Sequence, residues 1–507
     1  MTIRDCAVLC LGLAAIVRAQ APATSQGTSA AQLPLSGRAA QGGSVNTVQT
    51  PVPGVTSSVN TINTSVQMQG PYAGSVPGAG KAFSGKLSLR EAVERALAYN
   101  LGTEGLTQAM RQARGQAHVA RSALLPNVNG YLRETVLQQN LQAMGFRFNF
   151  HFPGISIPTI VGPFNYYDLR AQLTQTVADL TAMNNYRSAQ ELMKADAASL
   201  KDARDLVVLA AGGAYLQVIA AQARVNSARA QIDTARALFK QTQERRSVGL
   251  NPQIDVNRSQ VQLQTEEQRL MSLENDLAKQ KINLARVVGL PPNPAYEITD
   301  DVPYSPAPDL TVEQALKQAL ANRADLQAAE AQVRAAERAH SAARWEHLPS
   351  LAFEADYGAI GINPAQSHGT FTVSGTLRIP IWQGGRIEGE EQQADAALAQ
   401  RRAELADTRG RVEADVRDAL LDVQTAASQL AVARNNQKVA RETLTLTRQR
   451  FEAGIADSVE VTQAQEAVVS ADLDYITSVF AHNLGKVALA RAMGHAEAHL
   501  GAFLELH

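Results

Sequence analysis

Mostly apolar positions recur every seven residues along a segment near the C-terminal end of the chain. The recurring positions are Val416, Val423, Leu430, Gln437, Leu444 and Phe451, with Ala433, Ala440 and Thr447 between them. This spacing predicts a helix that packs along its whole length against other helices. No proline follows Pro380, so we expect this helix to run from Gly385 to Phe451. At ~1.5 Å per residue it is a rod of about 100 Å, several times the diameter of a compact domain.

A second long helix is predicted from about Thr181 to Ser247, and a turn follows each rod. Its seam residues are Val225, Ala228, Ile232, Ala235, Phe239 and Thr242. The pair Gly212-Gly213 predicts a bend within it. Return helices of about half this length are predicted over Gln253–Val288 and Asp457–Met493, which places hairpin tips at 248–251 and 453–456.

Two shorter helices are predicted over Ser88–Leu124 and Thr311–His347. Each begins with a Ser or Thr followed three residues later by Glu91 or Gln314, which is typical of a capped helix start. A Leu-Pro pair ends each helix. We expect the short helices to continue the half length that the return helices lack.

The chain duplicates one unit. Leu87–Ala92 matches Leu310–Ala315 at an offset of 223 residues, and Gly249 matches Gly454 at an offset of 205. A repeat of about 200 residues is too long for a solenoid, so it predicts a duplicated domain. The predicted divisions are a first structural repeat at 87–290, a proline-rich linker at 291–309, a second structural repeat at 310–494 and a tail at 495–507.

Four strands are predicted, one pair before the long helix of each repeat. They lie at about 127–138, 167–178, 350–360 and 370–382. Apolar and polar residues alternate in the last three, whereas the first is irregular. Strands of about ten residues with one apolar face are typical of a transmembrane barrel, and they equally fit an amphipathic sheet on a soluble core. The alternation alone leaves both interpretations open.

The N-terminal residues 1–19 have the pattern of a secretory signal peptide, with Arg4 before the apolar run Cys6–Val17. Those twelve residues are fewer than the ~20 that span a bilayer. Both cysteines, Cys6 and Cys10, lie in this segment, so no disulfide is expected in the mature chain. Residues 20–86 are low in complexity and carry few charges, which predicts a flexible arm.

Composition argues against several classes of function. The formal net charge is −1 and no basic face stands out, so nucleic acid is not expected as a partner. His495 and His499 are spaced as in a zinc peptidase, but the acid is not where that motif requires it. No catalytic residue, metal site or cofactor is predicted, and we do not expect an enzyme.

Polar residues at the two hairpin turns are the candidates for function. Asp255 and Glu460 each follow the turn glycine by six residues, and Arg258 and Gln463 follow it by nine. In one chain, acids at a helix start simply complement the helix dipole. If several chains bring the turns together around an axis, the same acids form a charged ring that filters or gates ions.

The duplicated unit behind a signal peptide resembles the TolC family of outer-membrane efflux proteins, over Leu87–Gly494. The most specific marks are Leu348-Pro349, the strand end Ile379–Gly385 and the paired turns. The resemblance implies a fold that is mainly helical with transmembrane strands. It also implies a homotrimer, with a twelve-stranded barrel in outer-membrane lipid continued by a long periplasmic α-helical barrel. The lower end of that tunnel meets a periplasmic adaptor, which links it to an inner-membrane pump.

The same resemblance implies roles for the residues at the turns. The tips that match the family's adaptor contacts are Val248, Gly249, Leu250, Ala453, Gly454 and Ile455. Glu460 and Gln463 match the entrance constriction, and Asp255 matches an aspartate of the gating network. The family's arginine partner is Ala456 here, with Arg258 as a substitute, and Phe451 stands where a gating tyrosine occurs.

We therefore expect a passive exit duct of a tripartite efflux or type I secretion system, in the outer membrane of a Gram-negative bacterium and extending into the periplasm. The alternative is a periplasmic adaptor protein, which also carries long helical hairpins. A cytoplasmic coiled-coil scaffold conflicts with the signal peptide.

Overall fold

The computed structural model describes residues 43–52, 61–76, 83, 85–145, 158–291, 296–300 and 304–497. These residues belong to one compact unit, Gly42–His507. The signal peptide predicted at 1–19 lies outside the described residues. The mainly helical fold with a duplicated unit is confirmed.

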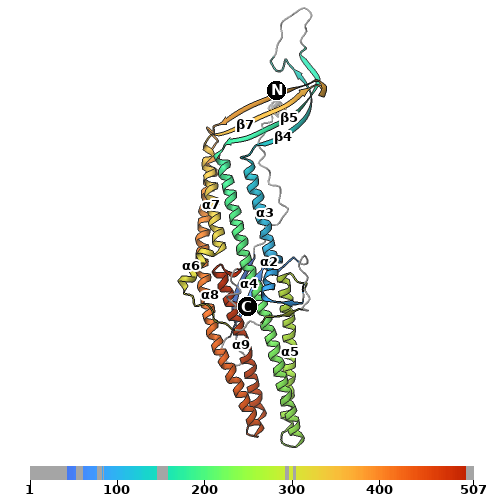
Figure 1. The fold of residues 1–507 in the computed structure, drawn as a ribbon, viewed down its shortest axis with the longest axis vertical. Coiled ribbons are helices and arrows are strands. Elements are labelled where there is room, and N and C mark those ends of the chain that lie inside the picture. The colour runs from blue at the N-terminus through green and yellow to red at the C-terminus, as the bar shows by residue number, and fades with distance from the viewer. Residues whose placement is uncertain are drawn as a thin grey trace, which may run out of the picture. The chain divides into compact units, whose positions relative to one another are not determined.

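The two rods are α4 (Leu180–Ser247) and α8 (Arg386–Glu452), and their return helices are α5 (Gln253–Val288) and α9 (Ser458–Ala492). They form two hairpins, α4–α5 and α8–α9, and α4 also packs against α9 (Figure 1). All the heptad positions except Gln437 are buried, which is why they recur as apolar residues. Although α4 is long and apolar enough to cross a membrane, 78% of its most apolar window is buried inside the protein.

Each short first helix is divided in two, which the sequence did not predict. Ser88–Leu124 holds α2 (Leu89–Tyr99) and α3 (Leu101–Ser122). The break is at Asn100, whose extended backbone is held because its side chain accepts from Gly102 N–H and donates to the carbonyl of Tyr72. These tertiary contacts satisfy the groups that a helix end leaves unpaired.

The second repeat has the same break. Thr311–His347 holds α6 (Val312–Asn322) and α7 (Ala324–Arg344), followed by a 3-10 turn at Trp345–His347. Arg323 stands at the break, with its side chain 2% exposed. In this repeat α7 packs against both α4 and α8, whereas in the first repeat α3 packs against α4.

The four strands form one antiparallel sheet in the order β4-β5-β7-β8. Their bounds are β4 (Asn127–Asn140), β5 (Ile160–Ala178), β7 (Ser350–Gly361) and β8 (Ser367–Arg378). β8 ends before Pro380, which has no N–H to donate to a ladder. Although its sequence is irregular, β4 pairs with β5 along its length, with one bulge at Leu137/Gln139.

The prediction of a flexible arm over 20–86 is wrong for the described part that begins at Gly43. β1 (Ser44–Val52) and β2 (Thr61–Gln69) pair as an antiparallel hairpin. Val45, Val66 and Tyr72 are buried in the main hydrophobic core with residues of α2, α4, α5 and α9. A short strand, β3 (Lys86–Leu87), then pairs in parallel with β6 (Glu297–Ile298) of the linker.

Glycines on the helices explain how this hairpin packs. A Cβ at Gly213 would lie 2.3 Å from Cγ2 of Val66, and one at Gly102 would lie 2.6 Å from the ring of Tyr72. Contacts this short are excluded for real side chains, so both positions need glycine. α4 continues as one helix through Gly212-Gly213. Gly213 therefore serves close packing against β2, whereas a Cβ at Gly212 would make an ordinary 3.6 Å contact with Val487 of α9.

Candidate functional site

The two hairpin turns have the same backbone and the same exposed apolar surface. Gly249 and Gly454 both adopt the left-handed conformation, with φ of 78° and 75°. The N–H groups of Leu250 and Ile455 donate to carbonyls of Arg245 and Arg450 at 2.8 and 2.9 Å. Val248, Leu250 and Ile455 are 69%, 69% and 71% exposed. Ala453 is exposed as well. The six tip residues therefore form two small apolar surfaces that the chain itself does not cover.

Phe451 connects the two hairpins just above the turns. Its ring is buried in a small core whose members are Leu238, Leu444, Phe451, Val461, Ala464 and Val468. The guanidinium of Arg245 on α4 lies 4.9 Å from the centre of the Phe451 ring. It also donates to the Phe451 carbonyl at 2.8 Å. Arg245 thus holds the end of α8, and sequence reasoning did not identify it.

Asp255 forms a second link between the hairpins. The hydroxyl of Ser458 on α9 donates to Asp255 Oδ1 at 2.8 Å, and the Asp255 side chain is only 16% exposed. Arg258 lies 3.9 Å from the same oxygen, but it is on the same helix as Asp255. Arg258 therefore does not replace an arginine that reaches across from the other hairpin; Ser458 provides the cross-link instead.

Glu460 stays within its own hairpin. Its carboxylate lies 3.1 Å from Nη1 of Arg450 on α8, and its side chain is 44% exposed. The start of α9 is capped by Asp457, which accepts from the N–H groups of Val459 and Glu460. Gln463 is exposed. In one chain, Glu460 and Gln463 therefore lie on the surface.

A buried carboxylate, Asp472 on α9, joins three helices farther from the turns. It accepts from Ser227 and Gln231 of α4 and from Gln437 and Arg441 of α8. Gln437 donates to it at 2.9 Å, which explains the one polar amide in the heptad seam. The sequence showed that Gln437 breaks the apolar pattern but not what it binds.

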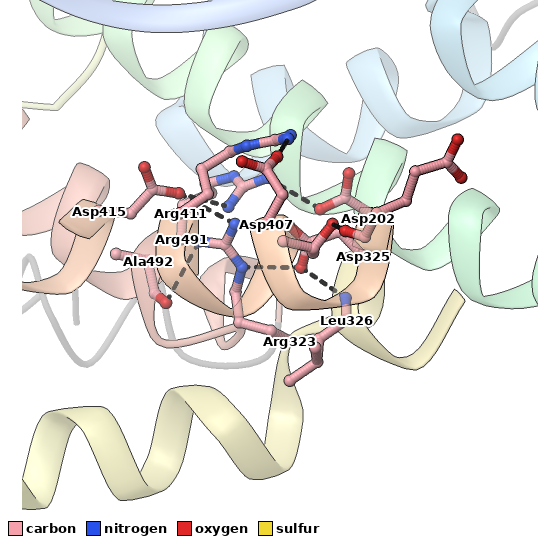
Figure 2. Close-up of polar contacts among 11 residues, drawn as sticks. Asp202, Arg323, Asp325, Leu326, Asp407, Arg411, Asp415, Arg491 and Ala492 are labelled. Carbon is pink, nitrogen blue, oxygen red and sulfur yellow. Dashed lines mark hydrogen bonds and ion pairs between the residues drawn. The ribbon is translucent and has the colours of Figure 1, made fainter. Parts of the chain in front are cut away.

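An ion-pair network occupies the junction of α4, α7, α8 and α9 (Figure 2). Buried Arg323 pairs with Asp325 at 2.6 Å and with Asp415 at 3.0 Å. Arg491 pairs with Asp202 at 2.9 Å. Burial raises the pKa of Asp202. Burial also disfavours the ionised form of Asp325, but its bonds to Arg323 outweigh this and lower its pKa.

This network lines a cavity of about 690 Å³ that also borders Gly43–Thr47 of the N-terminal segment. Its arginines and aspartates bond mainly to one another, as Figure 2 shows. Because each buried charge has a partner of opposite sign, the network fixes the helix junction. Within the described residues, no group of three or more His, Cys, Asp or Glu is arranged to hold a metal ion.

The strands form a sheet with two different faces. One face carries large apolar side chains that are exposed in the chain, namely Val128, Leu132, Val136, Leu169, Tyr357, Phe371, Val373 and Leu377. Phe371 is 74% exposed. On the opposite face, Arg170 bonds to Asp168 at 3.2 Å and to Asp356. A soluble protein buries the apolar face of such a sheet, so the exposed one favours contact with lipid.

Comparison with known proteins agrees with this geometry. Residues 93–290 and 315–495 match the family described as outer membrane efflux protein. The chain is 24% identical over 422 residues to the pyoverdine export outer membrane protein OpmQ of Pseudomonas aeruginosa, covering 82% of this chain and 86% of OpmQ. It is 25% identical over 438 residues to the outer membrane protein OprJ of the same species, covering 82% and 85%.

Solved structures with the same fold are outer membrane proteins. The crystal structure of VceC from Vibrio cholerae superposes with a TM-score of 0.68 at 19% identity, covering 80% of this chain and 96% of VceC. The CmeC outer membrane channel of Campylobacter jejuni gives a TM-score of 0.70 at 16% identity, covering 80% and 86%.

Proposed function

The chain belongs to the outer membrane efflux protein family, and we propose that three copies assemble into one continuous duct. As a member of this family, the protein is an exit duct of the outer membrane that extends into the periplasm. The family match decides against the periplasmic adaptor that was the alternative from sequence.

The two-faced sheet is the observation that supports this assembly. Among the residues that the structure describes, its edge strands, β4 and β8, each pair on one side only. An open sheet edge leaves backbone N–H and C=O groups that lipid cannot satisfy, so a sheet in a membrane must close. Pairing β8 of one copy with β4 of the next closes three sheets into a twelve-stranded barrel. The apolar face then meets outer-membrane lipid, and the polar face lines the lumen.

The hairpins continue the duct as a helical tunnel in the periplasm. Its lower end exposes the six tip residues, Val248 to Leu250 and Ala453 to Ile455. Small exposed apolar surfaces of this kind mark sites of protein contact. We assign them to a periplasmic adaptor, through which an inner-membrane pump supplies the cargo and the energy.

The residues just above the tips form the entrance and its gate in this proposal. Asp255 and Phe451 belong to the contacts that hold the hairpins together, and Arg258 lies beside Asp255 on the same helix. Glu460 and Gln463 contribute the polar surface of the constriction. Around a three-fold axis the carboxylates repeat as a ring, which favours cations.

We propose a small organic molecule as cargo, because the relative OpmQ is named for the export of pyoverdine. A system that secretes whole proteins by the type I route is the second candidate. Loss of the gene should increase the retention of fluorescent small molecules if the first assignment holds. Loss of an exported protein with unchanged small-molecule efflux would support the second.

Purification from the outer membrane tests the assembly. The protein in detergent should have the mass of three chains, and it should conduct ions in planar lipid bilayers. An apolar-to-charged variant at the sheet edge, Leu377→Asp, should prevent both. A monomer that conducts no ions, recovered from the soluble periplasmic fraction, would overturn the proposal.

A further inference from the structure

Arg170 lies flat across three strands of the sheet. In the register of β5, β7 and β8, Arg170 stands opposite Gly358, and Gly358 stands opposite Thr370. The guanidinium passes over the middle strand, because its Nη2 donates to Thr370 Oγ1 at 3.3 Å. On the way it bonds to Asp168 at 3.2 Å and to Asp356 of the middle strand.

Gly358 leaves room for the Arg170 side chain to cross the middle strand, β7. A Cβ at Gly358 would lie 2.6 Å from the carbonyl oxygen of Leu169 and 3.0 Å from Cβ of Arg170. A side chain there would therefore occupy the space that the arginine stem crosses. The neighbouring strand positions on the same face carry polar side chains, including Asp356 and Thr372, which stand opposite each other.

The contacts fix both the position and the charge of the guanidinium. Two carboxylates and a hydroxyl hold it, and a bonded guanidinium loses the freedom to extend away from the sheet. One arginine against two carboxylates leaves one net negative charge in this group. All three charged side chains are half-buried, so their mutual attraction is stronger than it would be in bulk water.

We propose that Arg170 is a specificity-determining residue of the strand part of the duct. This inference rests on the proposed function, because it takes the polar face as the face of the lumen. The arginine lies along the wall, leaves the passage free and offsets half of the negative charge of Asp168 and Asp356. Three copies place three such groups around the lumen. The wall therefore has only a weak preference for neutral and cationic cargo over anionic cargo. Without Arg170, six uncompensated carboxylates would face the cargo.

A cysteine placed beside the group can measure the local charge. Thr372 stands opposite Asp356, and the only native cysteines, Cys6 and Cys10, lie in the predicted signal peptide. The assembled protein carrying Thr372→Cys is treated with a cationic and an anionic methanethiosulfonate reagent of similar size. The ratio of the two modification rates reports the electrostatic potential at that point. Val373→Cys, on the apolar face, is the matched control.

Arg170→Gln should raise the ratio of cationic to anionic modification at least about threefold, since a unit charge several ångströms away across water changes local concentrations by this order. Asp356→Asn should lower the ratio by a similar factor. Arg170→Lys keeps the charge and should give a ratio close to that of the parent. Each variant is tested only as an assembled trimer, and Asp356→Asn provides the test if Arg170→Gln does not assemble.

The outcomes separate this inference from the proposed function. Suppose that Thr372→Cys is reactive, but that its ratio of cationic to anionic modification stays the same when Arg170→Gln or Asp356→Asn is added. This result would overturn the role of Arg170 and leave the duct intact. An unreactive Thr372→Cys beside a reactive Val373→Cys would show that the faces are reversed. That result would overturn the proposed assembly and the inference together.

Discussion

The two hairpin turns carry the same kinds of charged residue at matching positions and use them in different ways. At the offset of 205 residues, Arg245 matches Arg450 and Asp255 matches Glu460. In the first hairpin, the arginine and the acid both bond to the second hairpin, at Phe451 and Ser458. In the second hairpin, Arg450 and Glu460 bond to each other.

The two sets of contacts differ in how far they are covered, and therefore in what they contribute to stability. The links made by Arg245 and Asp255 are partly or fully covered, and breaking them leaves polar groups unsatisfied. The Arg450–Glu460 pair is about half exposed, and pairs of this kind contribute little to stability. The first set therefore joins the hairpins, and the second set presents charge at the surface.

The largest effect is expected where the two turns remain alike, at the exposed tips. Leu250→Asp together with Ile455→Asp should abolish efflux, because a charged side chain cannot be buried against an apolar adaptor surface. Either change alone shows whether both hairpins are needed. Efflux assays with an immunoblot of the outer membrane measure the effect. These sites are better than Gly249 or Gly454, whose positive φ would strain any other residue.

If the double variant retained efflux, the tips would not be part of the adaptor interface. Val432→Asp is a matched control, since it also places a carboxylate at an exposed apolar position of a long helix but away from the turns. It should leave efflux unchanged.

Arg245→Leu should weaken the joint between the hairpins by roughly 2–4 kcal/mol. It removes a hydrogen bond from a charged donor, about 1.5–3 kcal/mol, and a cation–π contact of about 0.5–1 kcal/mol. Hydrogen exchange of the amides around Phe451 should accelerate by about thirtyfold or more. Arg450→Leu, the matched change in the second repeat, should accelerate it less than about fivefold. Equal acceleration of exchange in Arg245→Leu and Arg450→Leu would contradict the inferred difference between the two hairpins.

The return helices differ in another matching pair, Leu277 of α5 and His482 of α9. Leu277 packs against the main core, whereas His482 is fully buried. The ring of Tyr304 in the linker lies with its centroid 5.0 Å from that of the His482 ring, tilted by 56°. Burial, with Lys486 nearby, lowers the pKa of His482 to about 4.

Since the folded pKa is below the ordinary 6.5, the unfolded chain binds the proton more readily. Stability is therefore complete above about pH 6.5 and falls as the pH drops towards 4. At pH 5 the loss should be roughly 2 kcal/mol. His482→Leu, which installs the residue of the first repeat, should remove this part of the pH dependence of the unfolding midpoint. An identical pH profile in His482→Leu would contradict the assignment.

The duplicated long helices could be predicted from the sequence because a seven-residue period is a local signal. The breaks at Asn100 and Arg323 could not, because each depends on contacts with distant segments, such as the bond from Asn100 to the carbonyl of Tyr72. The β1–β2 hairpin was missed for a similar reason. Its composition predicts disorder, yet Val66 packs against α4 because Gly213, more than a hundred residues away, leaves room for it.

The candidate site shows the same limit. Asp255 could be identified from its fixed distance after the turn glycine, and Phe451 from the seven-residue period and the family resemblance. Their partners, Ser458 and Arg245, come from the other hairpin about 200 residues away, so no local pattern shows the contact. One signal was available: the repeat offset that aligns the turns also aligns Arg245 with Arg450.

Asp255→Ala should cost about 1–2 kcal/mol of coupling between the hairpins, because Ser458 loses a charged hydrogen-bond acceptor. Ser458→Ala and the double variant complete a cycle that isolates the pair from other effects. The measurement is again amide exchange at the start of α9. Additive effects of the two single changes would show that this bond does not link the hairpins. Arg258→Ala should have little effect, since Arg258 meets Asp255 only along one helix.

The smallest change in stability, and a distinct change in selectivity, is expected at Glu460. The exposed pair with Arg450 contributes less than about 1 kcal/mol, so Glu460→Ala should unfold like the parent protein. In the assembled duct, it should leave three unpaired arginines near the entrance and reduce the preference for cations. Arg450→Gln should do the reverse, because it leaves the carboxylate unpaired. Reversal potentials across a salt gradient measure both. If neither variant changes the reversal potential, Glu460 serves only the start of α9, and the surface pair of the second hairpin has no part in selecting ions.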